Sequence, residues 1–137
     1  MDMIEIKWIK YDNFFDLWRR HKDGCKLLYV IGDQHHCYIG SIGGSRGKKG
    51  LGNRYQWQYL DRARSIFGQE ESAGQVAYVG LFQKPAEISG HLIRAAEAFT
   101  QNCCRMKLQP QACLFKCKKF VNNVDVSNVG DTPPFLN

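Results

Sequence analysis

The sequence lacks internal repeats, low-complexity segments and apolar runs of membrane-spanning length. None of its apolar stretches approaches the roughly 20 residues that a transmembrane helix needs. The first residues include the acidic Asp2 and Glu5, whereas a secretory signal begins with a basic patch and an apolar run. We therefore expect an intracellular, cytoplasmic protein that has no membrane partner.

The composition is that of one ordinary globular domain. The chain has 137 residues, of which 44% are hydrophobic and 23% are charged, and domains typically contain roughly 100–150 residues. We expect a single domain over residues 1–137. It comprises an N-terminal lead-in (residues 1–25), a central part (residues 26–104), and a basic segment with a C-terminal tail (residues 105–137). These features leave the oligomeric state open.

The six cysteines leave two interpretations open. Without a secretory signal, reduced thiols are favoured over disulfides, so we expect buried or partly buried free cysteines. The alternative is a zinc site built from Cys103, Cys104, Cys113 and Cys117. The spacing of Cys113 and Cys117 suits zinc ligands, whereas the adjacent Cys103 and Cys104 do not.

The positive charge is concentrated in two segments. Residues 42–64 hold six cations against the single acid Asp61, and residues 105–119 hold five cations and no acid, in a chain of net charge +6. Two such segments suit a nucleic-acid partner through its phosphate backbone, and solvated surface charge is the equally open alternative. The cations of the first segment are Arg46, Lys48, Lys49, Arg54, Arg62 and Arg64.

The hydrophobic pattern predicts an α+β fold with a small mixed or antiparallel sheet flanked by helices. Residues 26–31 and 37–42 are rich in β-formers and predict a hairpin. Residues 75–82 are apolar on both faces, which predicts a central strand. The other expected elements are a short strand at 4–9, a helix capped by Asp12 or Asn13 that runs toward His21, helices at 51–67 and 87–104, the second opened by Pro85, and a last strand within 114–126.

Within this pattern, three motifs resemble those of the GIY-YIG nuclease family. Tyr29 ends a triplet, Leu27-Leu28-Tyr29, that stands where the family has Gly-Ile-Tyr, and Tyr38-Ile39-Gly40 matches the second triplet. Gly50-Leu51-Gly52-Asn53-Arg54-Tyr55 is similar to the family's loop into a helix that presents an arginine. Glu97 lies on a later expected helix, where the family has its metal-binding glutamate. The resemblance covers roughly residues 27–99, about half the chain.

This resemblance implies an endonuclease, a hydrolase of phosphodiester bonds in DNA that depends on Mg²⁺ or Mn²⁺. It implies Tyr29 as the general base, Tyr38 as the residue that positions water or phosphate, and Glu97 as the metal ligand. Arg54 contacts the scissile phosphate, because a guanidinium binds phosphate bidentately, and Tyr59 assists. The basic residues Arg46, Lys48, Lys49 and Arg62 are expected to contact the DNA backbone.

Each of these roles has a structural alternative. Glu97 also fits a surface helix glutamate paired with Arg94 three residues earlier, and the two tyrosines also fit the packing of a half-exposed strand face. Because the first triplet retains only its tyrosine, the competing hypothesis is a catalytically inactive nucleic-acid-binding module of the same fold. A third hypothesis is a cysteine-rich metal-binding interaction protein.

Overall fold

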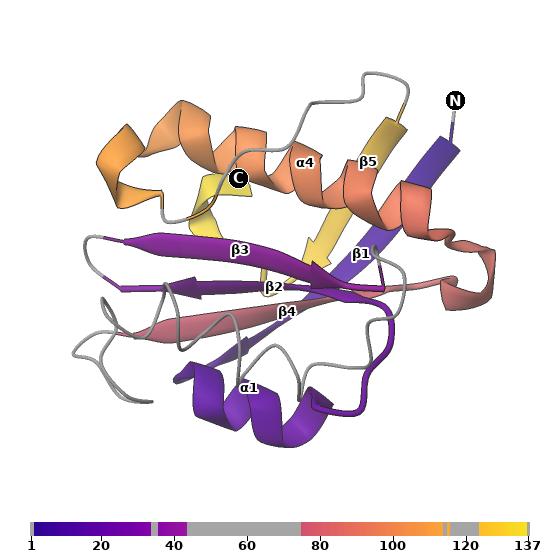
Figure 1. Cartoon of the computed structure of the whole chain (residues 1–137), viewed down its shortest axis with the longest axis horizontal. Coiled ribbons are helices and arrows are strands. Elements are labelled where there is room, and N and C mark those ends of the chain that lie inside the picture. Colours follow the sequence, from indigo (N-terminus) through magenta and orange to yellow (C-terminus); the bar gives the residue numbers. More distant parts are fainter. Residues whose placement is uncertain (1, 34–35, 44–74, 114, 116–123, 137) are drawn as a thin grey trace.

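The computed structural model describes residues 2–33, 36–43, 75–113, 115 and 124–136. Within these residues, five strands form one mixed sheet with a helix on each face (Figure 1), which confirms the α+β class. The elements are β1 (Asp2–Tyr11), α1 (Phe14–His21), β2 (Leu27–Gly32), β3 (Cys37–Ile42), β4 (Val76–Phe82), α4 (Gly90–Lys107) and β5 (Val124–Gly130), with 3-10 turns at Pro85–Glu87, Pro110–Ala112 and Pro134–Leu136.

The strand order is β3-β2-β4-β1-β5. β2 pairs antiparallel with both β3 and β4, β4 pairs antiparallel with β1, and β1 pairs parallel with β5. The predicted hairpin and the central position of β4 are confirmed. The first strand is longer than the predicted residues 4–9 and lies between β4 and β5, so the lead-in forms part of the sheet itself.

Two hydrophobic clusters occupy the two faces of the sheet. The face covered by α4 carries Ile6, Trp8 and Ile39, and the face covered by α1 carries Tyr29 and Ile31. Figure 1 shows α1 and α4 on opposite sides of the sheet. Because alternate side chains of a strand point to opposite faces, this two-sided burial fixes the direction of every side chain in the hairpin.

The predicted cap of α1 is confirmed at Asn13. Its side-chain Oδ1 accepts a hydrogen bond of 2.8 Å from the backbone N–H of Asp16, which satisfies one of the donors that a helix start leaves unpaired. The backbone N–H of Phe14 donates to Gln75 Oε1 at 2.7 Å. These bonds fix the start of α1 next to β4.

The start of α4 differs from the prediction. Pro85 opens a 3-10 turn rather than the helix, Ile88 is extended, and α4 begins at Gly90 behind the N-cap Ser89. The Ser89 side chain accepts a hydrogen bond from the Leu92 N–H at 3.2 Å. The start of α4 is therefore set by this cap and not by Pro85. Among the described residues, no helix is both long and apolar enough to cross a membrane.

The last strand extends beyond the predicted segment. It was expected within 114–126, and β5 runs from Val124 to Gly130, while residues 114 and 116–123 lie outside the described part of the chain. One of its polar residues, Asn128, is hydrogen-bonded to the neighbouring strand β1: its Oδ1 accepts from Trp8 Nε1 at 2.8 Å. Gly130, with a φ of +82°, ends the strand in a conformation that favours glycine.

Gly40 in β3 leaves the space that the Tyr29 ring fills, and its replacement tests the packing of the hairpin. A Cβ at Gly40 would lie 2.5 Å from the Cζ and Oη atoms of Tyr29, so Gly40→Ala is expected to destabilise the fold by about 2–3 kcal/mol. In the matched control Gly32→Ala, the new Cβ would lie 3.4 Å from the His36 carbonyl oxygen, an ordinary contact. Urea unfolding measures both, and equal losses would contradict this packing.

Candidate functional site

The two motif tyrosines lie side by side on the α1 face of the hairpin. Tyr29 in β2 and Tyr38 in β3 belong to the same cluster, and their ring centroids are 6.1 Å apart with near-parallel planes. This shared face is what their strand positions predict. Tyr29 is only 2% exposed and Tyr38 7%, so both rings are part of the packed interior.

Tyr29 is held from two sides. The ring of Phe14 in α1 lies 5.8 Å from the ring of Tyr29, centroid to centroid, and Gly40 of the neighbouring strand lies directly beneath it. The glycine of the second triplet therefore has a packing reason, because any side chain there would displace the tyrosine. Tyr29 is more deeply buried than the half-exposed strand face that the structural alternative assumed.

Glu97 is buried rather than placed on the surface of α4. Its side chain is 6% exposed, Ser41 Oγ donates to Oε1 at 2.5 Å, and Gln101 Nε2 donates to Oε2 at 3.1 Å. The alternative of a solvated surface glutamate is wrong. A buried carboxylate requires such donors, because leaving it unpaired costs several kcal/mol.

The described residues do not gather the predicted tyrosines and the glutamate into one site. In β3, Tyr38 faces α1, whereas Ile39 faces α4, and Ser41 shares the face of Ile39 because strand side chains alternate. Glu97 bonds to Ser41 and therefore lies on the opposite side of the sheet from Tyr29. Within the described sheet β3 is an edge strand, so the two faces adjoin along its outer edge.

The remaining predicted site residues cannot be placed. Arg54 and Tyr59, and with them Arg46, Lys48, Lys49 and Arg62, lie outside the described residues. The expected helix at 51–67 lies outside them as well. The predicted roles of these residues stay predictions.

The surroundings of Glu97 fit a divalent metal in ligand type. Ser41 Oγ donates to one carboxylate oxygen and Gln101 Nε2 to the other, and Mg²⁺ binds through one or two carboxylates while keeping several waters. Ser41 and Gln101 would then orient the carboxylate as outer-shell donors. Among the described residues, no group of three or more His, Cys, Asp or Glu side chains is arranged to hold a metal.

Ser41 and Gln101 were not among the predicted site residues. Gln101 is four residues after Glu97 and thus on the same face of α4, a spacing at which side chains meet. Its Nε2 also donates to the Ile39 carbonyl at 3.4 Å, which joins the glutamate to the motif strand. The i, i+4 spacing was readable in the sequence, whereas the contact with Ser41 depends on the docking of α4 against β3.

Three cysteines gather between β3 and the C-terminal end of α4. The Sγ atoms of Cys104 and Cys113 are 4.0 Å apart, and Cys37 forms an isolated β-bridge with Cys113. A hydrogen bond with Cys37, together with burial, raises the pKa of the Cys104 thiol far above its usual range. Of the predicted zinc set, Cys104 and Cys113 lie in this cluster, and Cys117 lies outside the described residues.

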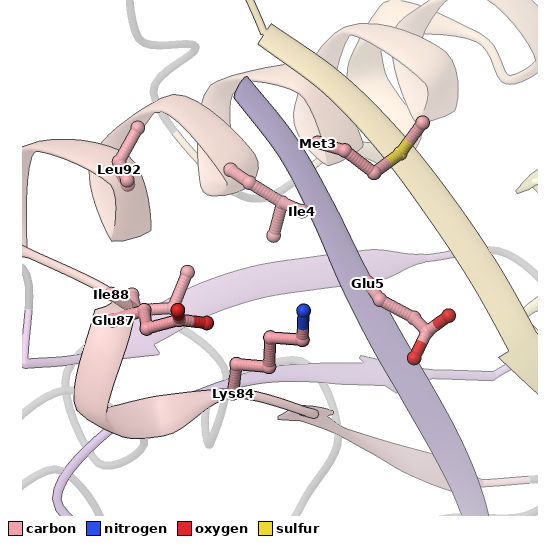
Figure 2. A pocket seen from close by; sticks show the side chains of 7 residues that line it. All are labelled: Met3, Ile4, Glu5, Lys84, Glu87, Ile88 and Leu92. Carbon is pink, nitrogen blue, oxygen red and sulfur yellow. The ribbon is translucent and has the colours of Figure 1, made fainter.

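A shallow hollow of about 350 Å³ lies beside the start of β1 (Figure 2). Lys84 and Glu87 line it together with Met3, Ile4, Glu5, Ile88 and Leu92. The hollow contains none of the predicted site residues, and its lining offers no nucleophile paired with a base. It does not serve as the candidate site.

Comparison of the chain with protein-family models, with curated proteins and with solved structures finds no match. The resemblance to the GIY-YIG nucleases therefore rests on the residues of this chain alone. The resemblance selects which side chains are candidates for the site. The structure shows in addition that Glu97 lies against the motif strand β3, where it is hydrogen-bonded to Ser41.

Removal of the Glu97 carboxylate is expected to destabilise the fold. Glu97→Ala removes the acceptor of the buried Ser41 hydroxyl and one of the acceptors of the Gln101 amide, so we expect a loss of about 2–3 kcal/mol in the free energy of unfolding. Glu87→Ala, at an exposed position in the turn before α4, is expected to change it by less than about 0.5 kcal/mol. Urea unfolding monitored by circular dichroism compares the two, and a similar small effect of both would place Glu97 on the surface.

The thiols are expected to differ in reactivity. Cys25 is exposed and Cys104 is buried with a raised pKa, so iodoacetamide at pH 8 is expected to alkylate Cys25 at least about tenfold faster in the folded protein. Peptide mass spectrometry measures the two rates, and labelling in urea is the control in which they converge. Equal rates in the folded protein would contradict the buried cluster.

Proposed function

We propose that the chain is a divalent-metal-dependent endonuclease that hydrolyses phosphodiester bonds in DNA. The observation that carries the proposal is the buried Glu97 carboxylate, which is hydrogen-bonded to Ser41 directly after the Tyr38-Ile39-Gly40 triplet. Burying a carboxylate is costly unless hydrogen-bond donors surround it, and a helix can be fixed against a strand by apolar contacts alone. A buried carboxylate oriented by two donors beside the motif strand therefore supports a functional role.

The chemistry requires a bound phosphate, a neutralised developing charge and an activated water. A divalent ion supplies the charge stabilisation when it is bound. On the side of the protein, Glu97 would hold the ion, Ser41 and Gln101 would fix the carboxylate, and Arg54 would bind the phosphate oxygens. Two basic segments in the sequence supply affinity for the DNA backbone.

The tyrosines have a weaker claim to catalysis than the glutamate. A general base must reach the proton it abstracts within about 3 Å or through one water, and Tyr29 is packed between Phe14 and Gly40 on the face opposite Glu97. Tyr38, in the terminal strand of the described sheet, lies closer to the edge that joins the faces. Of the two, Tyr38 is therefore better placed to contact water or phosphate.

A second candidate is a catalytically inactive module that binds nucleic acid. It is favoured by one observation: the sheet separates Glu97 from Tyr29. In this account Glu97 and Ser41 only fix α4 against β3, and the basic residues bind DNA without cleavage.

A plasmid nicking assay separates the two candidates. We expect the wild-type protein to nick supercoiled DNA with Mg²⁺ or Mn²⁺ and not with EDTA. We expect Glu97→Gln, which keeps the size of the side chain, and Arg54→Ala each to lower the rate by at least about a hundredfold. Glu87→Gln is the matched control for loss of a carboxylate and should retain the wild-type rate. Tyr38→Phe and Tyr29→Phe rank the two tyrosines.

Two outcomes would contradict the nuclease. The first is nicking that Glu97→Gln leaves unchanged, since the carboxylate then has no catalytic part. The second is DNA binding by the wild-type protein with no cleavage under any metal condition, which supports the inactive module instead.

A further inference from the structure

One stripe of α1 carries two half-buried aromatic rings, each with a cation over it. Phe15, Trp18, Arg19 and Lys22 follow one another at spacings of three, one and three residues, which places them on one stripe of the helix. The Phe15 and Trp18 rings stack 5.8 Å apart, the Arg19 guanidinium lies 5.6 Å from the Phe15 centroid, and Lys22 Nζ lies 5.2 Å from the Trp18 centroid.

These cations are exposed, and no described carboxylate pairs with them. Arg19, Arg20 and Lys22 are exposed, and in the described part of the chain no ion pair joins any of them to an acid. Asp16 shares a shallow hollow with Tyr11, Arg19 and Arg20 without pairing with either arginine. Unpaired cations over aromatic rings are partly ordered by cation–π attraction and so lose less side-chain entropy when they bind an anion.

His21, in the same turn, does not add to this charge. Burial, together with the nearby Arg20, lowers the pKa of His21 below its usual range, and its Nε2 lies 2.7 Å from the Tyr11 hydroxyl. The ring is therefore mostly neutral at pH 7. The positive charge of the surface comes from Arg19, Arg20 and Lys22, the cationic surface of α1.

Helix stability explains part of this arrangement and leaves part of it open. Cations in the last turn of a helix interact favourably with its dipole, which accounts for the position of the charges along α1. Trp18 packs partly buried against the cluster that contains Phe14 and Leu17, so packing accounts for this ring. Neither the dipole nor the core accounts for the Phe15 ring beneath Arg19, because Phe15 belongs to neither described core cluster.

We propose that the cationic surface of α1 binds the phosphodiester backbone of DNA without regard to base sequence. Unpaired guanidinium and ammonium groups match phosphate in charge and hydrogen-bonding geometry. The surface lies on the tyrosine side of the sheet, because Phe14 of the same helix packs on Tyr29. The choice of DNA as partner rests on the proposed function, while binding is measured separately from cleavage.

Fluorescence anisotropy with a labelled DNA duplex in EDTA tests this surface. We expect Arg19→Gln/Lys22→Gln to weaken binding at least tenfold at about 100 mM salt, and to reduce the slope of log K against log salt by up to about 2, since each phosphate contact contributes roughly 0.9. The matched control Lys7→Gln/Lys84→Gln removes two exposed charges outside α1 and should change binding less than about threefold. Thermal melting confirms that both variants fold.

The outcomes separate this surface from the nuclease. Equal weakening by the two double variants, or no DNA binding by the wild-type protein, would overturn the α1 proposal. So would binding to phosphatidylserine vesicles without binding to DNA. Loss of DNA binding in the α1 variant alone, in a protein that cleaves nothing, supports the surface and contradicts the nuclease. If the α1 variant cleaves DNA and binds it with unchanged affinity, the nuclease is supported and the α1 surface is contradicted.

Discussion

The burial of the β2–β3 hairpin on both faces is the constraint on which the rest of the structure depends. Because α1 covers one face and α4 the other, successive side chains of β3 enter different environments. Tyr38 joins the aromatic layer under α1, Ile39 enters the core under α4, and Ser41 meets Glu97. The direction of each motif side chain follows from this alternation, and so does the separation of the tyrosines from the carboxylate.

Much of the fold follows from local pattern. The hairpin, the central β4 and the Asn13 cap of α1 were predictable because β-forming composition, two-sided apolar composition and a capping side chain act over a few residues. The start of α4 was predicted three residues early, since Ser89 outweighs Pro85. The position of β1 between β4 and β5 depends on long-range pairing, about which residues 4–9 carry no local information.

The candidate site was predictable only in part, for a related reason. The resemblance to the GIY-YIG family selects Glu97, and the four-residue spacing on the helix indicates that Gln101 lies beside it. Neither observation indicates which face of the sheet α4 covers. That choice decides whether Glu97 and Tyr29 share a site, and it is made by the packing of whole elements. Arg54 and Tyr59 lie outside the described residues, so the resemblance alone assigns their roles.

The central claim is that the Glu97 carboxylate binds the divalent ion of a nuclease. Electron paramagnetic resonance of Mn²⁺ tests it most directly, because protein-bound Mn²⁺ loses the sharp signal of the free ion. With a phosphorothioate DNA duplex present to supply uncleaved phosphate, wild-type protein and Glu87→Gln are predicted to reduce the free Mn²⁺ signal beyond the level of DNA alone, and Glu97→Gln is predicted not to. Equal reduction by all three proteins, or none by the wild-type protein, would contradict the account.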